Sequence, residues 1–235
     1  MSTPKQIPMG LWLPAAMGRD DYFVTPANAR ALATVEGWRD WPQGKLVLTG
    51  PAGAGKSHLA HLWAAEAGAL VVRADDLVHD LAGGDPGALV AAHPRIALED
   101  GDRLAGDAAA EEVLFHLHNL IVAEQGRLLI TAQAPPSRWS LGLPDLVSRL
   151  QSTAVAVLDP PDDALLEAVL VKLFADRQLQ VSPSLIDYLL PRMERSLAAA
   201  QDLVTALDRR ALAGRRKVTP RLAGEVLAES GGSGT

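Results

Sequence analysis

The amino-acid sequence predicts an α/β protein in which a parallel five-stranded sheet precedes a small all-helical domain. Two observations lead to this prediction. Short apolar runs alternate with helix-forming segments as far as about residue 158, a pattern typical of parallel sheets with crossover helices. Beyond Asp159-Pro160-Pro161 every segment has helical periodicity. We therefore expect residues 1–20 to form a flexible leader, 21–158 the α/β core, 159–230 the helical domain and 231–235 a frayed tail.

The elements of the core are expected from apolar runs and the residues that flank them. Residues 1–20 hold too many prolines and glycines for a helix or a central strand. A helix is expected over about 26–37, with Pro26 in its first turn. Short apolar runs predict the five strands at 45–49, 69–73, 95–98, 127–131 and 154–158. The helices between them are expected at about 56–67, from Asp75-Asp76 onward and at about 108–124.

The helical domain is expected to begin after the two prolines, which no helix or strand tolerates in its interior. Its apolar residues recur with helical spacing in four segments. These predict helices at about 162–178, 183–192, 196–213 and 220–229.

A glycine-rich turn separates the first expected strand from the helix that follows it. The turn, Gly50-Pro51-Ala52-Gly53-Ala54-Gly55-Lys56-Ser57, fits the pattern G-x-x-x-x-G-K-[ST] in its required strand–turn–helix context. Glycines let backbone N–H groups point inward at the positive end of the helix dipole, where they bind phosphate. Lys56 is expected to reach the β- and γ-phosphates, and the Ser57 hydroxyl to bind Mg²⁺. The sequence therefore predicts a nucleotide-binding site, which includes the neighbouring His58.

Two adjacent carboxylates end the third expected strand. Because ligands collect at the carboxyl ends of parallel strands, Glu99 and Asp100 are expected to face the Mg²⁺ ion together with Ser57. ATPases of this layout usually place Asp first, for the metal, and Glu second, to orient water. The reversed order here predicts weak or no ATP hydrolysis by the chain itself. A solvated acidic turn is the alternative interpretation. His61, on the expected helix after the turn, has no acidic partner in the sequence pattern.

Two further polar residues stand where they could meet a phosphate. Thr131, at the end of the fourth expected strand, is either a sensor of the γ-phosphate or a surface threonine. Arg149 stands shortly before the fifth expected strand. Such an arginine either enters a neighbouring subunit's nucleotide site, as an arginine finger supplied in trans, or forms a surface ion pair. The residues alone leave both interpretations open.

Composition excludes several classes of protein. The 235 residues are 48% apolar, which is ample for a core, and their net charge of −6 excludes a globally basic nucleic-acid binder. Cysteine is absent, which excludes disulfides and thiolate metal sites and fits a cytoplasmic protein. No uninterrupted apolar stretch approaches the roughly 18 residues of a membrane-spanning helix, so no membrane segment is expected.

Four segments together resemble the DnaA-related branch of the AAA+ ATPases, and within it the Hda group, which regulates the replication initiator DnaA. They are GPAGAGKSHL (50–59), EEVLFHLHNL (111–120), LLITAQAPP (128–136) and LGLPDLVSRL (141–150). The resemblance covers about residues 6–227, and Asp159-Pro160-Pro161 matches the junction to that family's helical lid domain. Many unrelated proteins share the first segment, whereas the last two are specific.

The resemblance implies a P-loop AAA+ core with a helical lid, ADP or ATP as ligand, and a role for each site residue. It makes Arg149 the arginine finger that promotes hydrolysis of ATP held by DnaA and so returns the initiator to its inactive ADP form. Family members usually carry a sensor arginine in the third lid helix. Ala198 stands at that position here, and Arg195, one turn earlier, is the expected substitute. A monomer and a homodimer both remain open.

The segment Gln6-Ile7-Pro8-Met9-Gly10-Leu11-Trp12 resembles the peptide by which bacterial proteins dock on the sliding clamp of DNA polymerase. Gln6 is expected to form hydrogen bonds at one pocket, while Met9, Leu11 and Trp12 fill an apolar one. A segment stiffened by proline costs little entropy to order. The alternative is that Trp12 packs against the chain's own core.

The sequence offers little for strong direct DNA binding. Between Arg73 and Arg95 there is no Lys, Arg, Phe, Tyr or Trp, whereas the matching region of the DnaA initiator grips single-stranded DNA with basic and aromatic residues. One basic run occurs in the lid: Arg209, Arg210, Arg215, Arg216, Lys217 and Arg221. We interpret it as a helix C-terminus with a solvated face; contact with DNA or a partner protein is the other interpretation.

The leading hypothesis is therefore a negative regulator of replication initiation that works on DnaA from the sliding clamp. The alternative is a self-sufficient DNA-associated ATPase, either initiator-like or helicase-loading, which needs efficient turnover at Glu99-Asp100 and a basic path for DNA. A small-molecule kinase is the third hypothesis, and in it the clamp-like segment has no role.

Overall fold

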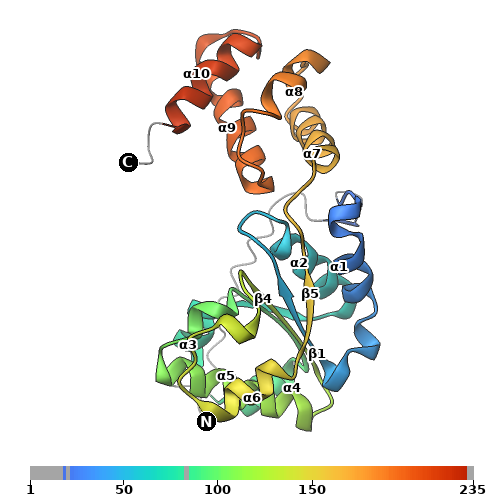
Figure 1. Cartoon of the computed structure of the whole chain (residues 1–235), viewed down its shortest axis with the longest axis vertical. Coiled ribbons are helices and arrows are strands. Elements are labelled where there is room, and N and C mark those ends of the chain that lie inside the picture. The colour runs from blue at the N-terminus through green and yellow to red at the C-terminus, as the bar shows by residue number, and fades with distance from the viewer. Residues whose placement is uncertain (1–17, 20–21, 82–84, 232–235) are drawn as a thin grey trace, which may run out of the picture.

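A computed structural model describes residues 18–19, 22–81 and 85–231, which form an α/β core and a helical lid (Figure 1). The strands are β1 (Lys45–Thr49), β2 (Leu70–Arg73), β3 (Arg95–Glu99), β4 (Arg127–Ala132) and β5 (Ala154–Val157). The core helices are α1 (Pro26–Glu36), α2 (Lys56–Ala67), α3 (Ala74–Leu81), α4 (Pro86–Ala92), α5 (Ala108–Ala123) and α6 (Pro144–Gln151). The lid helices are α7 (Asp163–Asp176), α8 (Pro183–Leu189), α9 (Leu197–Gly214) and α10 (Pro220–Gly231).

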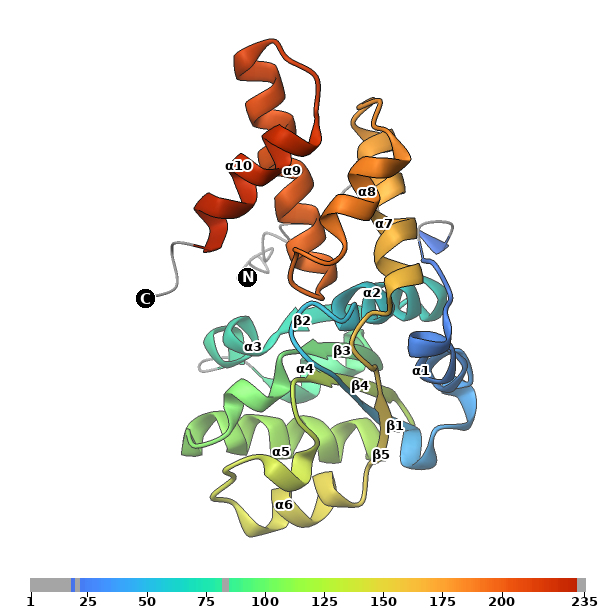
Figure 2. The same cartoon turned by 45° about the horizontal axis from the view of Figure 1, so that its top comes forward.

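The five strands form one parallel sheet in the order β2-β3-β4-β1-β5, which confirms the predicted sheet. Every residue of β1 is buried, as expected for a strand with helices on both faces. Leu46 and Leu48 pack with α1 and α2, whereas Val47 packs with α5 on the opposite face (Figure 2). This strand order places the segment after β1 between the ends of β4 and β5.

Two core helices were not expected from the sequence. α4 and α6 are only 7 and 8 residues long, so each offers too few turns for a periodic pattern to stand out. α6 begins with Pro144 in its first turn and buries Leu146 and Leu150. It therefore fixes the orientation of the residues that lead into β5.

The lid helices enclose a core of their own, in which Leu166, Leu170 and Phe174 of α7 meet Leu203 and Leu207 of α9. The Asp162 carboxylate accepts a hydrogen bond from the Leu165 N–H (2.8 Å) and so caps α7 directly after the two prolines. Among the described residues, no helix is both long and apolar enough to cross a membrane.

Candidate functional site

The turn between β1 and α2 has the backbone shape of a phosphate loop. Gly53 (φ 69°) and Gly55 (φ 99°) lie in the left-handed region, which glycine adopts without a steric penalty. A Cβ atom at Gly50 would lie 2.6 Å from the carbonyl oxygen of Leu158, so only glycine fits there. Pro51 and Ala52 are exposed, and Ala54 is buried beneath the turn.

Lys56 is the first residue of α2 and its ammonium group lies inside the loop. Its Nζ donates hydrogen bonds to the carbonyl oxygens of Gly50 and Pro51, both at 2.8 Å. Burial lowers the pKa of Lys56, and the nearby carboxylates of Asp100 and Asp102 partly oppose that shift. The ammonium therefore lies between the loop and an acidic turn, and Ser57 follows it with an exposed side chain.

The acidic turn lies at the carboxyl end of β3. Glu99 ends the strand with its side chain buried, and Asp100 adopts a left-handed backbone conformation (φ 57°). The Asp100 N–H donates a hydrogen bond to the Thr131 hydroxyl (3.0 Å). Thr131 is therefore a buried residue of β4 that contacts the acidic turn, rather than the surface threonine of the alternative interpretation.

His61 has an acidic neighbour, contrary to the expectation from the sequence. Its Nε2 lies 3.9 Å from Glu99 Oε2. The sequence pattern could not reveal this contact because sheet order, not chain order, brings α2 to the end of β3. Ser57 and His61 are four residues apart on α2 and so share a face. Glu99 thus lies beside the face of α2 that carries Ser57.

His58 packs its ring edge-on against Tyr22, with 5.2 Å between ring centroids.

The sequence analysis missed Asp102. Its Oδ2 accepts a hydrogen bond from the Gln133 N–H (2.9 Å), and its charge acts on Lys56. Its position two residues beyond the Glu99-Asp100 pair was the available signal. The turn therefore carries three carboxylates at the edge of the sheet where the loop lies.

These residues fit a nucleotide with Mg²⁺. The carboxylate oxygen Oε1 of Glu99 is buried and has no hydrogen-bond partner among the described residues. A buried carboxylate oxygen is costly unless an ion or an ordered water supplies its partner. Oxygen ligands from carboxylates and a hydroxyl are those that Mg²⁺ prefers, and a glycine loop at a helix N-terminus suits phosphate.

The lid contacts the loop directly at the start of α9. The Leu197 N–H donates to the Gly53 carbonyl oxygen (2.8 Å), and a Cβ atom at Gly53 would lie 3.5 Å from the Ala198 Cβ atom. Arg195 instead pairs with Asp163 Oδ1 (2.7 Å) and donates to the Pro161 carbonyl oxygen (3.3 Å). It thus ties the residues before α9 to the lid junction.

Arg149 lies on α6, far from the chain's own loop. Its guanidinium carbon is 5.4 Å from the centre of the Phe115 ring. Burial lowers the pKa of Lys45, at the start of β1, and the charge of Arg149 lowers it further. The loop follows the other end of β1, about five residues or roughly 16 Å away. Arg149 is exposed, and no carboxylate among the described residues pairs with it.

A buried carboxylate holds the segment that leads into α6. Glu111 accepts hydrogen bonds from the N–H groups of Gly106 (2.9 Å), Gly142 (2.9 Å) and Leu143 (2.8 Å). Burial raises the pKa of Glu111, but these three donors outweigh it and leave the pKa below its ordinary value. Glu111 therefore positions the helix that carries Arg149.

The remaining predicted residues are not part of this arrangement. Gln6, Met9, Leu11 and Trp12 lie outside the described residues.

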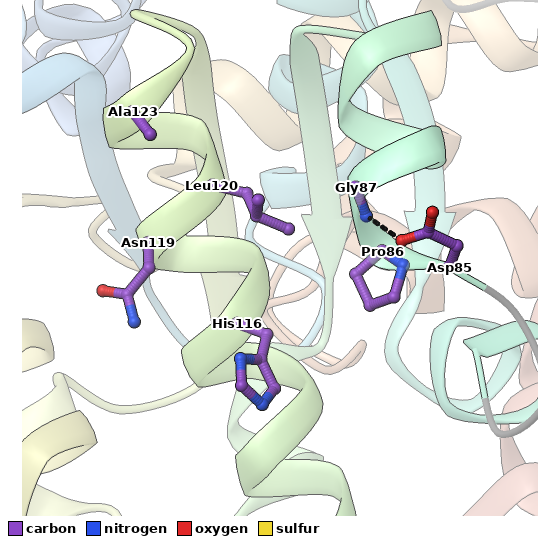
Figure 3. A pocket seen from close by; sticks show the side chains of 7 residues that line it. All are labelled: Asp85, Pro86, Gly87, His116, Asn119, Leu120 and Ala123. Atoms are coloured by element: carbon purple, nitrogen blue, oxygen red, sulfur yellow. Dashed lines mark hydrogen bonds between the residues drawn. The ribbon is translucent and has the colours of Figure 1, made fainter.

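An open groove of about 490 Å³ lies between α4 and α5, where Pro86 faces His116 and Leu120 (Figure 3). None of the loop or acidic-turn residues lines that groove.

Comparison with solved structures identifies the architecture. Domain III of the Thermotoga maritima replication initiation protein DnaA matches with a TM-score of 0.82 and 18% identity, over 92% of this chain and 98% of that one. The chain has the AAA+ fold of DnaA. AMPPCP-bound DnaA from Aquifex aeolicus matches with a TM-score of 0.71 and 17% identity, over 86% of this chain and 68% of that one.

The same AAA+ fold occurs in the Thermotoga maritima RuvB Holliday junction branch migration motor. The match has a TM-score of 0.65 and 15% identity, and covers 90% of this chain and 71% of the motor. No family model matches the sequence. At these identities the comparisons establish the fold.

Proposed function

We propose that the protein is a negative regulator of DNA replication initiation that promotes hydrolysis of ATP held by DnaA. In this role it binds ADP or ATP with Mg²⁺ at residues 50–57, docks on the sliding clamp through Gln6, Met9, Leu11 and Trp12, and presents Arg149 to its partner. It acts in the cytoplasm. The observation that carries the proposal is the position of Arg149: exposed, without a carboxylate partner among the described residues, and remote from its own loop.

The nucleotide is held by groups already placed for it. Backbone N–H groups of the glycine turn face the phosphates, Lys56 neutralises their charge, and Thr131 fixes the acidic turn beside them. The Ser57 hydroxyl and the Glu99 and Asp100 carboxylates would hold Mg²⁺, which would neutralise charge on the β- and γ-phosphates. Comparison supports this assignment, because DnaA of the same fold binds AMPPCP.

The chain's own residues favour holding a nucleotide over hydrolysing it. Glu99 is buried against His61, and Arg195 is occupied by Asp163. No arginine contact from the lid reaches the loop among the described residues; the Leu197 N–H donates to the Gly53 carbonyl oxygen instead. The nucleotide therefore acts as a structural ligand that fixes the lid against the core.

Hydrolysis takes place in the partner's site, where Arg149 completes the set of charges around the γ-phosphate. Its guanidinium donates to the oxygens that gain charge in the transition state, and such an arginine is worth roughly 10³–10⁵ in rate. Glu111, through Gly142 and Leu143, holds α6 so that Arg149 arrives in one orientation.

Turnover measurements separate this function from a self-sufficient ATPase. The isolated protein is expected to hydrolyse ATP slowly, with no stimulation by single-stranded DNA, and to accelerate hydrolysis of ATP preloaded on DnaA when clamp is present. Appreciable DNA-stimulated turnover by the protein alone, without an effect on DnaA, would establish the motor function instead.

A further inference from the structure

The end of α9, the turn after it and the start of α10 carry six cations in thirteen residues, 209–221, with no carboxylate among them. The expected explanation was a helix C-terminus with a solvated face. The structure divides the six into two sets with different surroundings. One set is paired with carboxylates of α10, and the other forms no ion pair with any carboxylate of the described residues.

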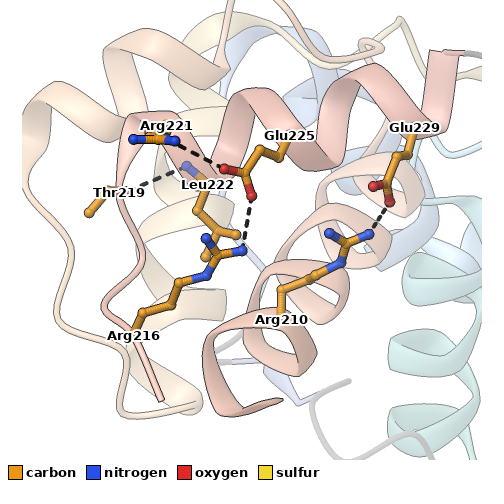
Figure 4. Close-up of polar contacts among 7 residues, drawn as sticks. All are labelled: Arg210, Arg216, Thr219, Arg221, Leu222, Glu225 and Glu229. Carbon is orange, nitrogen blue, oxygen red and sulfur yellow. Dashed lines mark hydrogen bonds and ion pairs between the residues drawn. The ribbon is translucent and has the colours of Figure 1, made fainter. Parts of the chain in front are cut away.

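The paired set joins α9 and its turn to α10 (Figure 4). Arg210 pairs with Glu229, and Arg216 pairs with Glu225 at 2.9 Å. Arg221 lies 3.7 Å from Glu225 on the same helix. These three cations are accounted for by the packing of the lid.

The second set consists of Arg209, Arg215 and Lys217, all exposed and without an ion pair to any described residue. Leu212 lies among them with 80% of its surface exposed, the largest exposed fraction of any large apolar residue in the described chain. Arg209 and Leu212 are three residues apart on α9 and share a face. We call these four residues the lid tip.

The backbone at the lid tip adds a third observation. Arg215 adopts a left-handed conformation (φ 47°) at the C-cap of α9, where glycine is the favoured residue. A non-glycine residue pays a steric cost there, on the order of 1 kcal/mol. No ion pair within the described residues offsets this steric cost. An arginine is thus left at the apex of the turn beside Leu212.

We propose that the lid tip binds an acidic segment of a partner protein, in which an apolar side chain is flanked by carboxylates. Charge complementarity supports this occupant. Residues 209–229 carry six cations and two carboxylates, a net charge of +4, whereas the whole chain carries −6, so the rest carries −10. A basic surface of this kind on an acidic protein attracts carboxylates, and Leu212 supplies the apolar centre inside a charged rim.

A protein segment suits the lid tip better than nucleic acid does. No Phe, Tyr or Trp follows Tyr188 in the sequence, so no aromatic side chain of the second half of the lid can stack on a base. A phosphate backbone also offers no apolar partner for Leu212. The remaining −10 charge of the chain repels a long polyanion more than a short acidic segment, because only the long ligand extends beyond the lid tip over the acidic surface.

The lid tip and Arg149 lie at opposite ends of the molecule, with α6 at the bottom and the α9–α10 turn at the top of Figure 1. One partner at each site can therefore bind at the same time. The inference does not depend on the role proposed for Arg149.

Fluorescence anisotropy tests the proposal with a labelled 14-residue peptide that repeats two glutamates and two leucines. We expect the full-length protein to bind it, with at least a tenfold loss of affinity in the triple variant Arg209→Gln/Arg215→Gln/Lys217→Gln. Leu212→Ser is expected to weaken binding several-fold. The matched control Arg30→Gln/Arg138→Gln/Arg192→Gln removes the same charge from exposed sites elsewhere and should bind as the wild type does.

Two further probes make each result decisive. A glutamate–serine peptide of equal charge should bind less tightly than the leucine-containing peptide. All substituted side chains are exposed, and thermal melting checks that the variants stay folded. Equal binding by the lid-tip and control triples overturns the proposal. So does an unchanged affinity in Leu212→Ser, or a 20-base-pair DNA duplex that binds as tightly as the peptide and competes with it.

Discussion

The backbone N–H of Leu197 donates a 2.8 Å hydrogen bond to the carbonyl oxygen of Gly53, so the first residue of α9 is joined to the phosphate loop. The Ser196 hydroxyl occupies the space where a Cβ atom at Gly53 would lie. No long side chain separates the lid from the loop at this point. The hydrogen bond and this close packing therefore tie the position of the loop to that of the lid.

Gly53→Ala is expected to weaken ADP binding at least tenfold. The new Cβ atom would lie 1.9 Å from Ser196 Oγ on a backbone already at φ 69°, so the lid or the loop must move. Isothermal titration with ADP measures the effect. Gly68→Ala is the matched control: Gly68 also has a left-handed backbone (φ 65°), but a Cβ atom added there would meet no other atom within 4 Å. It should cost about 1 kcal/mol of stability and leave the ADP affinity unchanged. Equal ADP affinities for the two variants would show that the Gly53–Ser196 contact is irrelevant to binding.

Glu111→Gln is expected to destabilise the protein by about 1.5–3 kcal/mol, since a buried charged acceptor of three N–H groups is replaced by an amide with one acceptor oxygen. The pKa of Glu111 is lowered in the folded state, so its stabilisation is present above the ordinary pKa and is lost as the pH falls through the lowered value. Urea unfolding at pH 7 and in acid measures both effects. The exposed neighbour Glu112→Gln should change neither.

His118 makes folding sensitive to mild acid. Its Nε2 lies 2.6 Å from the Nζ of Lys45, and both side chains are buried. Burial lowers the pKa of His118 to about 4, with further contributions from Lys45 and Arg149. The unfolded chain therefore binds a proton between about pH 6.5 and pH 4 that the folded chain does not.

Stability should consequently fall as the pH is lowered from about 6.5 to 4, by at most about 1.4 kcal/mol per pH unit from this residue. His118→Asn should flatten that part of the stability–pH curve, whereas the exposed His116→Asn should leave it unchanged. Urea titrations across this range give the comparison. Parallel curves for wild type and His118→Asn would contradict the assignment.

Clamp docking is expected to require the leader. Gln6→Ala/Trp12→Ala should abolish retention of the protein on an immobilised sliding clamp, because the pair removes both the hydrogen-bonding group and the largest apolar side chain. ADP binding by the variant should match that of the wild type. Full retention of the double variant on the clamp would remove docking from the proposed function.

The sheet and the loop could be predicted from the sequence because their signals are local. β1 is a continuous apolar run, and the glycines after it need left-handed conformations that few other residues adopt. The contacts between elements could not be predicted in this way. The His61–Glu99 contact depends on sheet order, and the Lys45–His118 pair joins residues 73 positions apart.

Ion pairing shows the same limit in the lid. The basic run at 209–221 contains no carboxylate, so the sequence suggested a uniform solvated face. Glu225 and Glu229 of α10 form ion pairs with three of its cations, whereas Arg209, Arg215 and Lys217 are exposed and unpaired among the described residues. Only the antiparallel packing of α9 and α10 distinguishes the two sets.

The most direct test of the proposed mechanism is the single-turnover rate of hydrolysis of ATP bound to DnaA, measured with clamp loaded on DNA. The rate is compared in the presence of the wild-type protein, Arg149→Ala or Arg138→Ala. Arg138 is an exposed arginine of the same core and serves as the control. We expect the wild type and Arg138→Ala to accelerate hydrolysis equally, and Arg149→Ala to lose about 10³-fold or return the rate to that of DnaA alone. Acceleration by Arg149→Ala equal to that of the wild type, with clamp and ADP binding intact, would contradict the mechanism.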